Sequence, residues 1–202
     1  TNMKKILLLV LALTSTTFFA QHTTTGASSD WSNTAAWTQG TVPTASDNVE
    51  ISHAITVTAS DAVCNNLTVN YNGGAGSLTI SGNDAKVDAG GTGTIGGSVT
   101  VTGGSATNPA TLDIAGDLSI TTGSITVNAG QRFILGSSGA SANTTATGPI
   151  DINSDSNLHG SFYNYGTWTS NSVTGKINYN RFIANLNTWD LIGAPVSNLS
   201  IN

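Results

Sequence analysis

The segments Ser77–Ser81 (SLTIS) and Ser98–Thr102 (SVTVT) carry the same alternation of hydroxyl and apolar residues. The motif at their start, Ser or Thr followed by an apolar residue and Thr, recurs at the same step in Thr56–Thr58 and Ser119–Thr121. Alternation with a period of two is typical of a β-strand with one buried face. A constant step between such strands is typical of a solenoid, in which each turn of chain stacks on the one before. The sequence therefore predicts an all-β fold, a single-stranded parallel β-helix with about 21 residues per turn.

Equivalent positions of successive turns form columns in such a fold. The constant step predicts an inward column of Val57, Leu78, Val99 and Ile120 and an outward column of Thr58, Thr79, Thr100 and Thr121. Clusters of Gly and Asn between the strands predict turns. A β-sandwich also contains many short strands and is the alternative fold, but it has no reason to keep one phase along the chain.

The composition excludes several classes of protein. Thr, Ser, Gly and Asn make up close to half of the 202 residues, and these residue types are poor helix formers. Only 8% of the residues are charged, against about 25% in a typical soluble domain. Six Lys and Arg residues and a net charge of -5 argue against a nucleic-acid partner, which requires a basic surface.

The first residues have the pattern of a secretory signal peptide. Lys4 and Lys5 precede the apolar run Ile6–Leu13, and a small residue, Ala20, stands at the expected cleavage point. The run is too short for a membrane span, which needs about 20 apolar residues. We therefore expect a secreted or cell-surface protein with no membrane insertion after cleavage. The predicted organisation is a signal peptide at 1–20, an N-terminal cap at 21–45, a β-helix at 46–185 and the start of a following module at 186–202.

Two terminal stretches resemble a known group of proteins. The series Trp31, Trp37, Pro43, Asp47, Val49 and Ile51 is similar to the N-terminal portion of large secreted β-helix proteins of Bacteroidetes, of flavobacterial type, and to the opening of G8-like domains. The segment Trp189–Val196 is similar to a stretch of the same proteins. The resemblance implies a right-handed coil, an adhesin-like surface protein and export by the type IX secretion system. Because the sorting domain of that system is not found before Asn202, we expect the chain to be the front end of a longer protein.

Aromatic residues gather towards the two ends of the predicted solenoid. Trp31, Trp37 and Tyr71 lie near its start, and we expect them to cap the open end, because a bare end exposes apolar core and unpaired strand edges. Near the other end, Tyr163, Tyr165 and Trp168 are candidates for a sugar-stacking platform, since aromatic faces pack well on the apolar faces of sugars.

Metal chemistry has one candidate. Asp151, Asn153 and Asp155 place oxygen ligands at the first positions of a calcium-loop pattern, but Ser156 and Phe162 stand where such a loop needs Gly and Glu. Calcium is therefore the one cofactor left open. The isolated His22, His53 and His159 lack the spacing of a zinc site, and we expect His22 to lie in a solvated tail. The single cysteine, Cys64, is predicted to be a small buried hydrophobic residue.

Catalysis has one candidate constellation. Asp113 and Asp117, with Arg132 or Lys86 on neighbouring turns, are the carboxylates that could flank a polysaccharide. Both aspartates also border the Ala115–Gly116 turn, where Asp is common for conformational reasons. We therefore expect no enzyme.

The resulting hypothesis is a structural or adhesive segment of a secreted surface protein, with extracellular glycans or surface matrix as partners. A carbohydrate-binding or polysaccharide-degrading β-helix is one alternative. An ice-binding solenoid is another, because stacked Thr columns present hydroxyls about 4.8 Å apart between turns.

Overall fold

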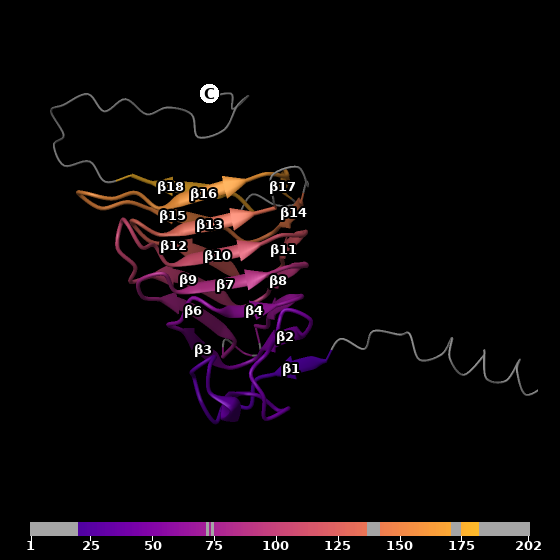
Figure 1. The fold of residues 1–202 in the computed structure, drawn as a ribbon. Helices are drawn as coiled ribbons and strands as arrows, with labels where there is room; N and C mark the ends of the chain where they lie inside the picture. Colours follow the sequence, from indigo (N-terminus) through magenta and orange to yellow (C-terminus); the bar gives the residue numbers. More distant parts are fainter. Residues whose placement is uncertain (1–19, 72, 74, 137–141, 171–174, 182–202) are drawn as a thin grey trace, which may run out of the picture.

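The chain forms a solenoid of parallel β-strands with about six turns, spaced about 25 residues apart (Figure 1). The computed structural model describes residues 20–71, 73, 75–136, 142–170 and 175–181. The predicted signal peptide, apart from residue 20, and the predicted module at 186–202 lie outside these residues. The predicted all-β solenoid class is confirmed.

Strands of the described residues form three sheets, which run along the solenoid axis. Sheet I contains β1 (Gln21–Thr23), β2 (Asn48–Ile51), β5 (Leu67–Val69), β8 (Gly93–Ile95), β11 (Leu118–Ile120), β14 (Asn143–Ala146) and β17 (Thr167–Ser170). Sheet II contains β3 (Ala54–Val57), β6 (Ser77–Ser81), β9 (Ser98–Thr102), β12 (Ser124–Val127), β15 (Ile150–Asn153) and β18 (Ile177–Asn180). Sheet III contains β4 (Ala62–Cys64), β7 (Lys86–Ala89), β10 (Thr111–Ile114), β13 (Arg132–Leu135) and β16 (Ser161–Asn164). From β2 onward the chain visits sheets I, II and III in this order, so each complete turn contributes one strand to each sheet.

The turns differ in length, which corrects the constant step predicted from the sequence. Ser77 pairs with Ser98 at the predicted step, but Ser98 pairs with Ser124 at a longer one. Thr56 pairs with Thr79 rather than standing level with Ser77, and Ser119 belongs to β11 in sheet I. The predicted columns are therefore right for Leu78–Val99 and Thr79–Thr100 and wrong at both ends. Hydrogen bonds between strands set the register, and loops of variable length at the corners absorb the difference.

Apolar side chains fill the interior in columns. In sheet II the strands show alternating burial, and the inward column is Ile55, Leu78, Val99, Ile125 and Ile150. Sheet III contributes Phe133, whose ring stacks on Phe162 with 4.9 Å between centroids. Removal of this apolar surface from water is the main force that holds the turns together. Cys64 is buried in this core, as predicted, and burial together with the nearby charge of Asp88 raises the pKa of its thiol to about 12.

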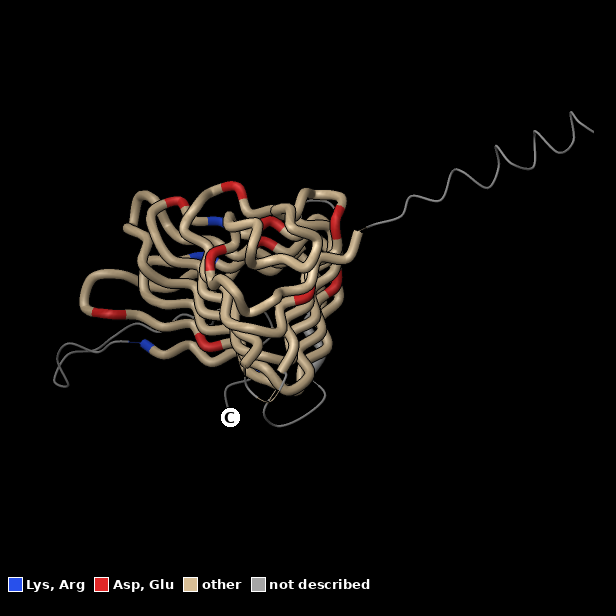
Figure 2. Tube along the Cα trace, turned by 90° about the horizontal axis from the view of Figure 1, so that it is seen from below, with Lys and Arg blue, Asp and Glu red and all other residues tan. Residues whose placement is uncertain are grey.

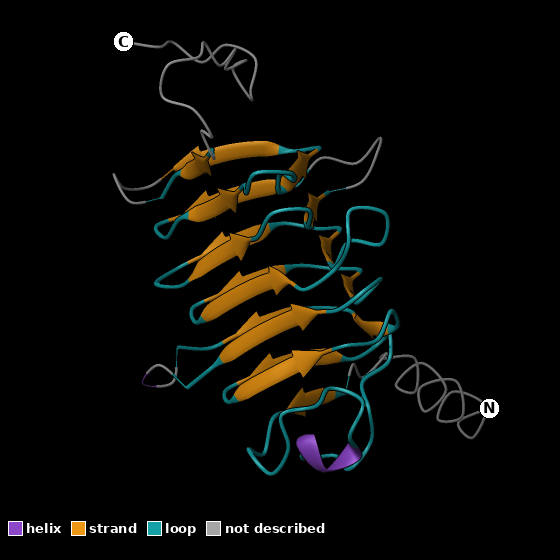
Figure 3. Cartoon of the chain, turned by 90° about the vertical axis from the view of Figure 1, so that its left-hand side faces the viewer, coloured by secondary structure: helices purple, strands orange, loops and turns teal. Residues whose placement is uncertain are grey.

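The N-terminal end of the solenoid is covered by the segment before β2. Residues 21–45, the predicted cap, contain β1, the short 3-10 helix η1 (Thr34–Ala36) and loops (Figure 3). Trp31 and Trp37 pack edge to face with 5.0 Å between centroids, and the indole N–H of Trp37 donates to the Trp31 carbonyl at 2.8 Å. Both tryptophans are buried, as expected for capping residues, whereas β1 also extends sheet I by pairing with β2. Among the described residues, no helix has the length and apolar character that crossing a membrane requires.

Four glycines stack at the corner where sheet I passes into sheet II. They are Gly76, Gly97, Gly123 and Gly148, each one or two residues before a strand of sheet II. A Cβ on Gly97 would overlap the carbonyl oxygen of Gly76, and the same conflict arises between Gly123 and Gly97 and between Gly148 and Gly123. Successive turns therefore approach each other here too closely for any side chain.

This close approach predicts the effect of a single methyl group. We expect Gly97→Ala to lower the free energy of unfolding by about 2 kcal/mol or more, because the backbone of the neighbouring turn must shift. Gly90→Ala is the matched control, since the nearest atom to its Cβ would be the Cys64 carbonyl oxygen at 3.9 Å. Thermal and urea unfolding of the two variants provide the measurement. Equal stabilities would contradict the close stacking.

Candidate functional site

The outer face of sheet II carries an ordered set of hydroxyl groups, which we call the hydroxyl face. Its columns are Thr56, Thr79, Thr100 and Thr126; Ser77, Ser98 and Ser124; and Ser81 and Thr102. These side chains alternate with buried residues and are exposed or half-buried. Neighbouring strands of a sheet lie about 4.8 Å apart, and every second residue along a strand is about 6.7 Å apart. The hydroxyl face is thus a rigid two-dimensional array over four turns.

Charge is nearly absent from the hydroxyl face. Its strands β3, β6, β9 and β12 contain no charged residue. One aspartate flanks it at each end: Asp30, which forms an isolated parallel bridge with Thr56, and Asp151 on β15. In the view along the axis, charged positions are few and most of the coil carries none (Figure 2). The face can therefore offer hydrogen bonds to a neutral partner without removing a charged group from water.

A shallow groove borders the hydroxyl face at the glycine corner, and we call it the corner groove. It has a volume of about 290 Å³ and is lined by Tyr71, Gly76, Gly96, Gly97, Ser98, Thr122, Gly123, Ser124 and Pro149. Tyr71 follows β5 and is 60% exposed. Tyr71 is therefore not the capping residue that the sequence predicts. In the sequence, Tyr71 is an isolated aromatic residue in a segment rich in Asn and Gly, which is typical of an exposed loop.

The outer face of sheet III carries an ionic cluster. The ammonium group of Lys86 lies 2.9 Å from a carboxylate oxygen of Asp88 and 3.2 Å from one of Asp113. Partial burial alone would lower the pKa of Lys86, but the hydrogen bonds to these two aspartates outweigh it and raise the pKa. The cation and the two carboxylates thus satisfy one another on this face.

The candidate catalytic residues are divided among different partners. Asp113 is paired with Lys86, as just described, whereas Asp117 lies in the following loop and accepts the backbone N–H of Asn143 at 2.8 Å. The guanidinium of Arg132 lies over the ring of Tyr163, 5.7 Å from its centroid. The structure therefore brings Asp113 to Lys86 but engages Asp117 and Arg132 elsewhere.

The predicted sugar platform is spread over two sheets. Tyr163 lies on β16 of sheet III, Tyr165 lies in the short loop between β16 and β17, and Trp168 lies on β17 of sheet I. Tyr163 and Tyr165 are exposed. The backbone of Trp168 pairs with that of Thr144, a buried residue. The three residues therefore do not belong to one sheet face.

The predicted calcium ligands each have protein partners. Asp151 accepts a hydrogen bond from the side chain of Asn178 at 2.7 Å. The side chain of Asn153 bonds to Asn128, directly after β12, and to Asn180 on β18. Asp155 accepts the backbone N–H groups of Asn157 and Leu158, and these bonds lower its pKa. Among the residues that the structure describes, no three or more His, Cys, Asp or Glu side chains form a group that could hold a metal. Calcium binding at Asp151, Asn153 and Asp155 stays a prediction.

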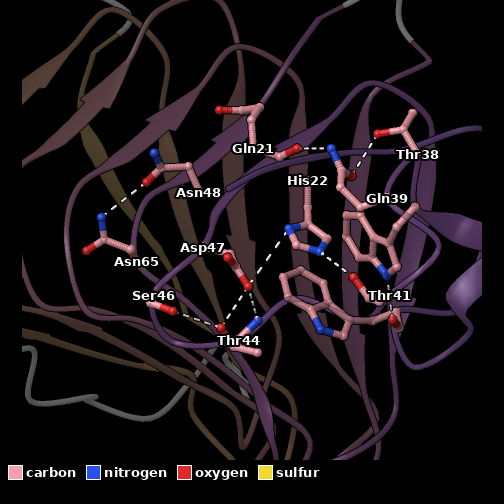
Figure 4. A network of polar contacts seen from close by, with 12 residues as sticks. Gln21, His22, Thr38, Gln39, Thr41, Thr44, Ser46, Asp47, Asn48 and Asn65 are labelled. Carbon is pink, nitrogen blue, oxygen red and sulfur yellow. Dashed lines mark hydrogen bonds and ion pairs between the residues drawn. The ribbon is translucent and has the colours of Figure 1, made fainter. Parts of the chain in front are cut away.

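The cap contains a polar network around His22 (Figure 4). His22 is only 3% exposed, so the expectation of a solvated tail residue is wrong. Its Nε2 lies 3.2 Å from the hydroxyl of Thr41, and its Nδ1 faces a carboxylate oxygen of Asp47 at 3.9 Å. Pairing of β1 with β2 draws His22 inward, beside the edge of the Trp37 ring.

Asp47 closes the loop that leads from the cap into β2. Its carboxylate accepts the backbone N–H of Thr44 at 2.8 Å and the Thr44 hydroxyl at 2.7 Å. Desolvation alone would raise the pKa of Asp47, but the bonds from Thr44, helped by His22, lower it below 3.8. This is an anchoring contact for the cap.

Comparison with known proteins found no matching family model, no matching curated protein and no matching solved structure.

The lowered pKa of Asp47 predicts an acid-dependent contribution to stability. The ionised carboxylate stabilises the fold above pH 3.8, and this contribution is lost as the pH falls through the lower pKa of the folded state. We expect Asp47→Ala to lower the free energy of unfolding by about 1 kcal/mol near pH 7, with the difference from the parent chain vanishing towards pH 2. Urea unfolding across this pH range measures the effect. Asp61→Ala, at an exposed aspartate beside the first turn, is the control, and an equal loss in both variants would contradict the assignment.

Proposed function

We propose that this chain is a non-catalytic structural and adhesive segment of an exported surface protein. The observation that carries the proposal is the hydroxyl face, an uncharged array held in register by the parallel strands of sheet II. The partners that suit it are neutral extracellular materials such as glycans or surface matrix.

The physical basis is the addition of many weak contacts on a rigid support. A single hydroxyl group gains little from exchanging water for another partner, about 1 kcal/mol per hydrogen bond. A sheet fixes all its hydroxyls before the partner arrives, so little conformational entropy is lost on binding. An extended regular surface is therefore suited to a partner that is itself extended and regular.

Two further features support the proposal. The pairing of Asp113 with Lys86 and the separate engagement of Asp117 favour a structural role for the candidate catalytic carboxylates. The basic and apolar pattern of residues 3–20 favours export. The resemblance of the terminal motifs to Bacteroidetes surface proteins adds type IX secretion as the proposed route.

Paired variants test the hydroxyl face against another face of the same molecule. Thr79→Lys with Thr100→Lys places two charges at the centre of the hydroxyl face, whereas Thr68→Lys with Thr94→Lys places them on the outer face of sheet I. We expect the first pair to lower retention of the purified chain on cellulose, chitin and agarose particles by about tenfold, and the second pair to have little effect. Retention measured by sedimentation, with circular dichroism to verify folding, gives the result. Equal retention of both variants, or no retention of the parent chain on any particle, would sink the proposal.

Ice binding is a second candidate function, favoured by the corrected threonine column. Thr56, Thr79, Thr100 and Thr126 stand level on adjacent strands, beside a parallel column of serines. All four threonines of the observed column belong to sheet II, so their hydroxyls are regularly spaced on one face. The column predicted from the sequence included Thr58 and Thr121, which lie outside the strands of this sheet.

Ice binding predicts a direct signal. The purified chain should lower the freezing point below the melting point and shape growing ice crystals, and Thr79→Lys with Thr100→Lys should abolish both effects. Nanolitre osmometry measures the gap between the two temperatures. A gap of zero at millimolar protein removes this candidate and leaves the adhesive proposal untouched.

A further inference from the structure

We propose that the corner groove binds a linear chain of neutral sugar residues, which lies parallel to the solenoid axis and stacks one residue on Tyr71. The inference rests on the proposed adhesive function and names a ligand class and a site for it. It differs from the predicted platform of Tyr163, Tyr165 and Trp168, which lies on β16, in the loop after β16 and on β17, at the C-terminal end of the solenoid (Figure 1).

The groove crosses four successive turns. Tyr71 and Gly76 belong to the corner between β5 and β6, Ser98 begins β9, Ser124 begins β12, and Pro149 precedes β15. Adjacent turns are separated by about 4.8 Å, so the groove extends roughly 14 Å along the axis. This shape suits a narrow linear ligand with a repeat close to that of the turns, and the length of one sugar residue in an extended chain is of this size.

The glycine stack explains why the floor of the groove carries no side chains. No side chain can stand at Gly97 or Gly123, because the carbonyl of the preceding turn occupies that space. The backbone of the floor is hydrogen-bonded internally: the N–H of Ser98 donates to Gly76 at 3.3 Å and that of Ser124 donates to Gly97 at 3.2 Å. The floor is therefore a rigid backbone surface, and the side chains at its edges remain to determine what binds.

Those edge side chains combine hydroxyls with one aromatic ring. Ser98 and Ser124 present hydroxyls that both donate and accept, as sugar hydroxyls do. Tyr71 projects a largely exposed ring, and tyrosine combines an apolar face with a polar tip. A sugar residue has the complementary construction, with an apolar C–H face and polar edges.

The corner groove is lined by uncharged residues, which favours a neutral sugar chain over an acidic one. None of the nine lining residues is ionisable at neutral pH. An acidic polysaccharide would find no cation here, and a basic peptide would find no carboxylate. A proline-rich peptide also stacks on aromatic residues, but such grooves are lined by several of them, whereas Tyr71 is the one aromatic residue in this groove. The volume of about 290 Å³ lies at the lower limit for ligand pockets, which fits weak binding of a chain at several positions.

The experiment measures binding of the purified chain to soluble polysaccharides by affinity electrophoresis and calorimetry. The neutral probes are laminarin, galactomannan, arabinoxylan and dextran; alginate and hyaluronan are the acidic probes, and a polyproline peptide tests the other ligand class. The variants are Tyr71→Ala and Tyr71→Phe. Tyr179→Ala is the matched control, because Tyr179 is also a solvent-exposed tyrosine, 42% exposed, on β18.

We expect at least one neutral polysaccharide to bind and no acidic one. Tyr71→Ala should weaken that binding by about tenfold or more, since a central aromatic contact commonly dominates such a site. Tyr71→Phe keeps the stacking ring and should change the affinity by less than about threefold, and Tyr179→Ala should leave it unchanged. Tyr71 is exposed, so each variant should retain the circular dichroism spectrum and melting temperature of the parent chain.

Three outcomes would overturn the inference: no binding of any neutral polysaccharide, binding that survives Tyr71→Ala, or preferential binding of polyproline or an acidic polysaccharide. Binding lost in a Tyr163→Ala and Tyr165→Ala double variant but not in Tyr71→Ala would assign the ligand to the rival platform. The particle assay on the hydroxyl face is independent of these results. Loss of particle retention in the Thr79 and Thr100 variant, together with unchanged polysaccharide binding in Tyr71→Ala, would leave the adhesive function standing and reject the groove.

Discussion

Parallel hydrogen bonding between successive turns is the constraint on which the rest of this structure depends. Each strand must lie level with its neighbour in the turn before, so every inward position stacks on another inward position. A polar residue in such a column would be buried between two apolar neighbours without a partner, which is costly. The interior columns of Ile, Leu and Val follow directly, as in the series from Ile55 to Ile150.

The same constraint produces both surfaces to which we assign function. Because the strands are level, residues that face outward also stand in columns, and the choice of Thr and Ser at these positions makes the hydroxyl face. Because the strands stay level up to their ends, the corner between sheets I and II brings backbones together and admits only glycine at Gly97 and Gly123. The corner groove is thus a consequence of stacking, and Tyr71, two residues after β5, lies at its edge.

Much of the fold could be predicted from particular residues, and most of the candidate site could not. The alternation in Ser77–Ser81 and Ser98–Thr102 identified both strands, their buried faces and their mutual register. The same step applied to Thr56 and Ser119 failed, because corner loops of different lengths lie between those strands and their neighbours. The burial of His22 depends on residues far apart in the chain, and no local pattern indicates it. The repeat did place Lys86 and Asp113 on neighbouring turns, but it did not predict their ion pair. Tyr71 was recognisable as an aromatic residue near one end, but its exposure depends on where its loop leaves the coil.

The sequence by itself determined that this chain forms short strands with one apolar and one hydroxyl face, and that these strands coil into a solenoid. Both properties follow from local chemistry, since side chains alternate between two faces with a period of two whatever the strand pairs with. Only the tertiary structure decided which strand stacks on which, and hence where the hydroxyl columns, the glycine corner and the groove lie. Pairing closes over about 25 residues and depends on the length of each corner loop, so the register is a property of the whole coil and not of any one segment.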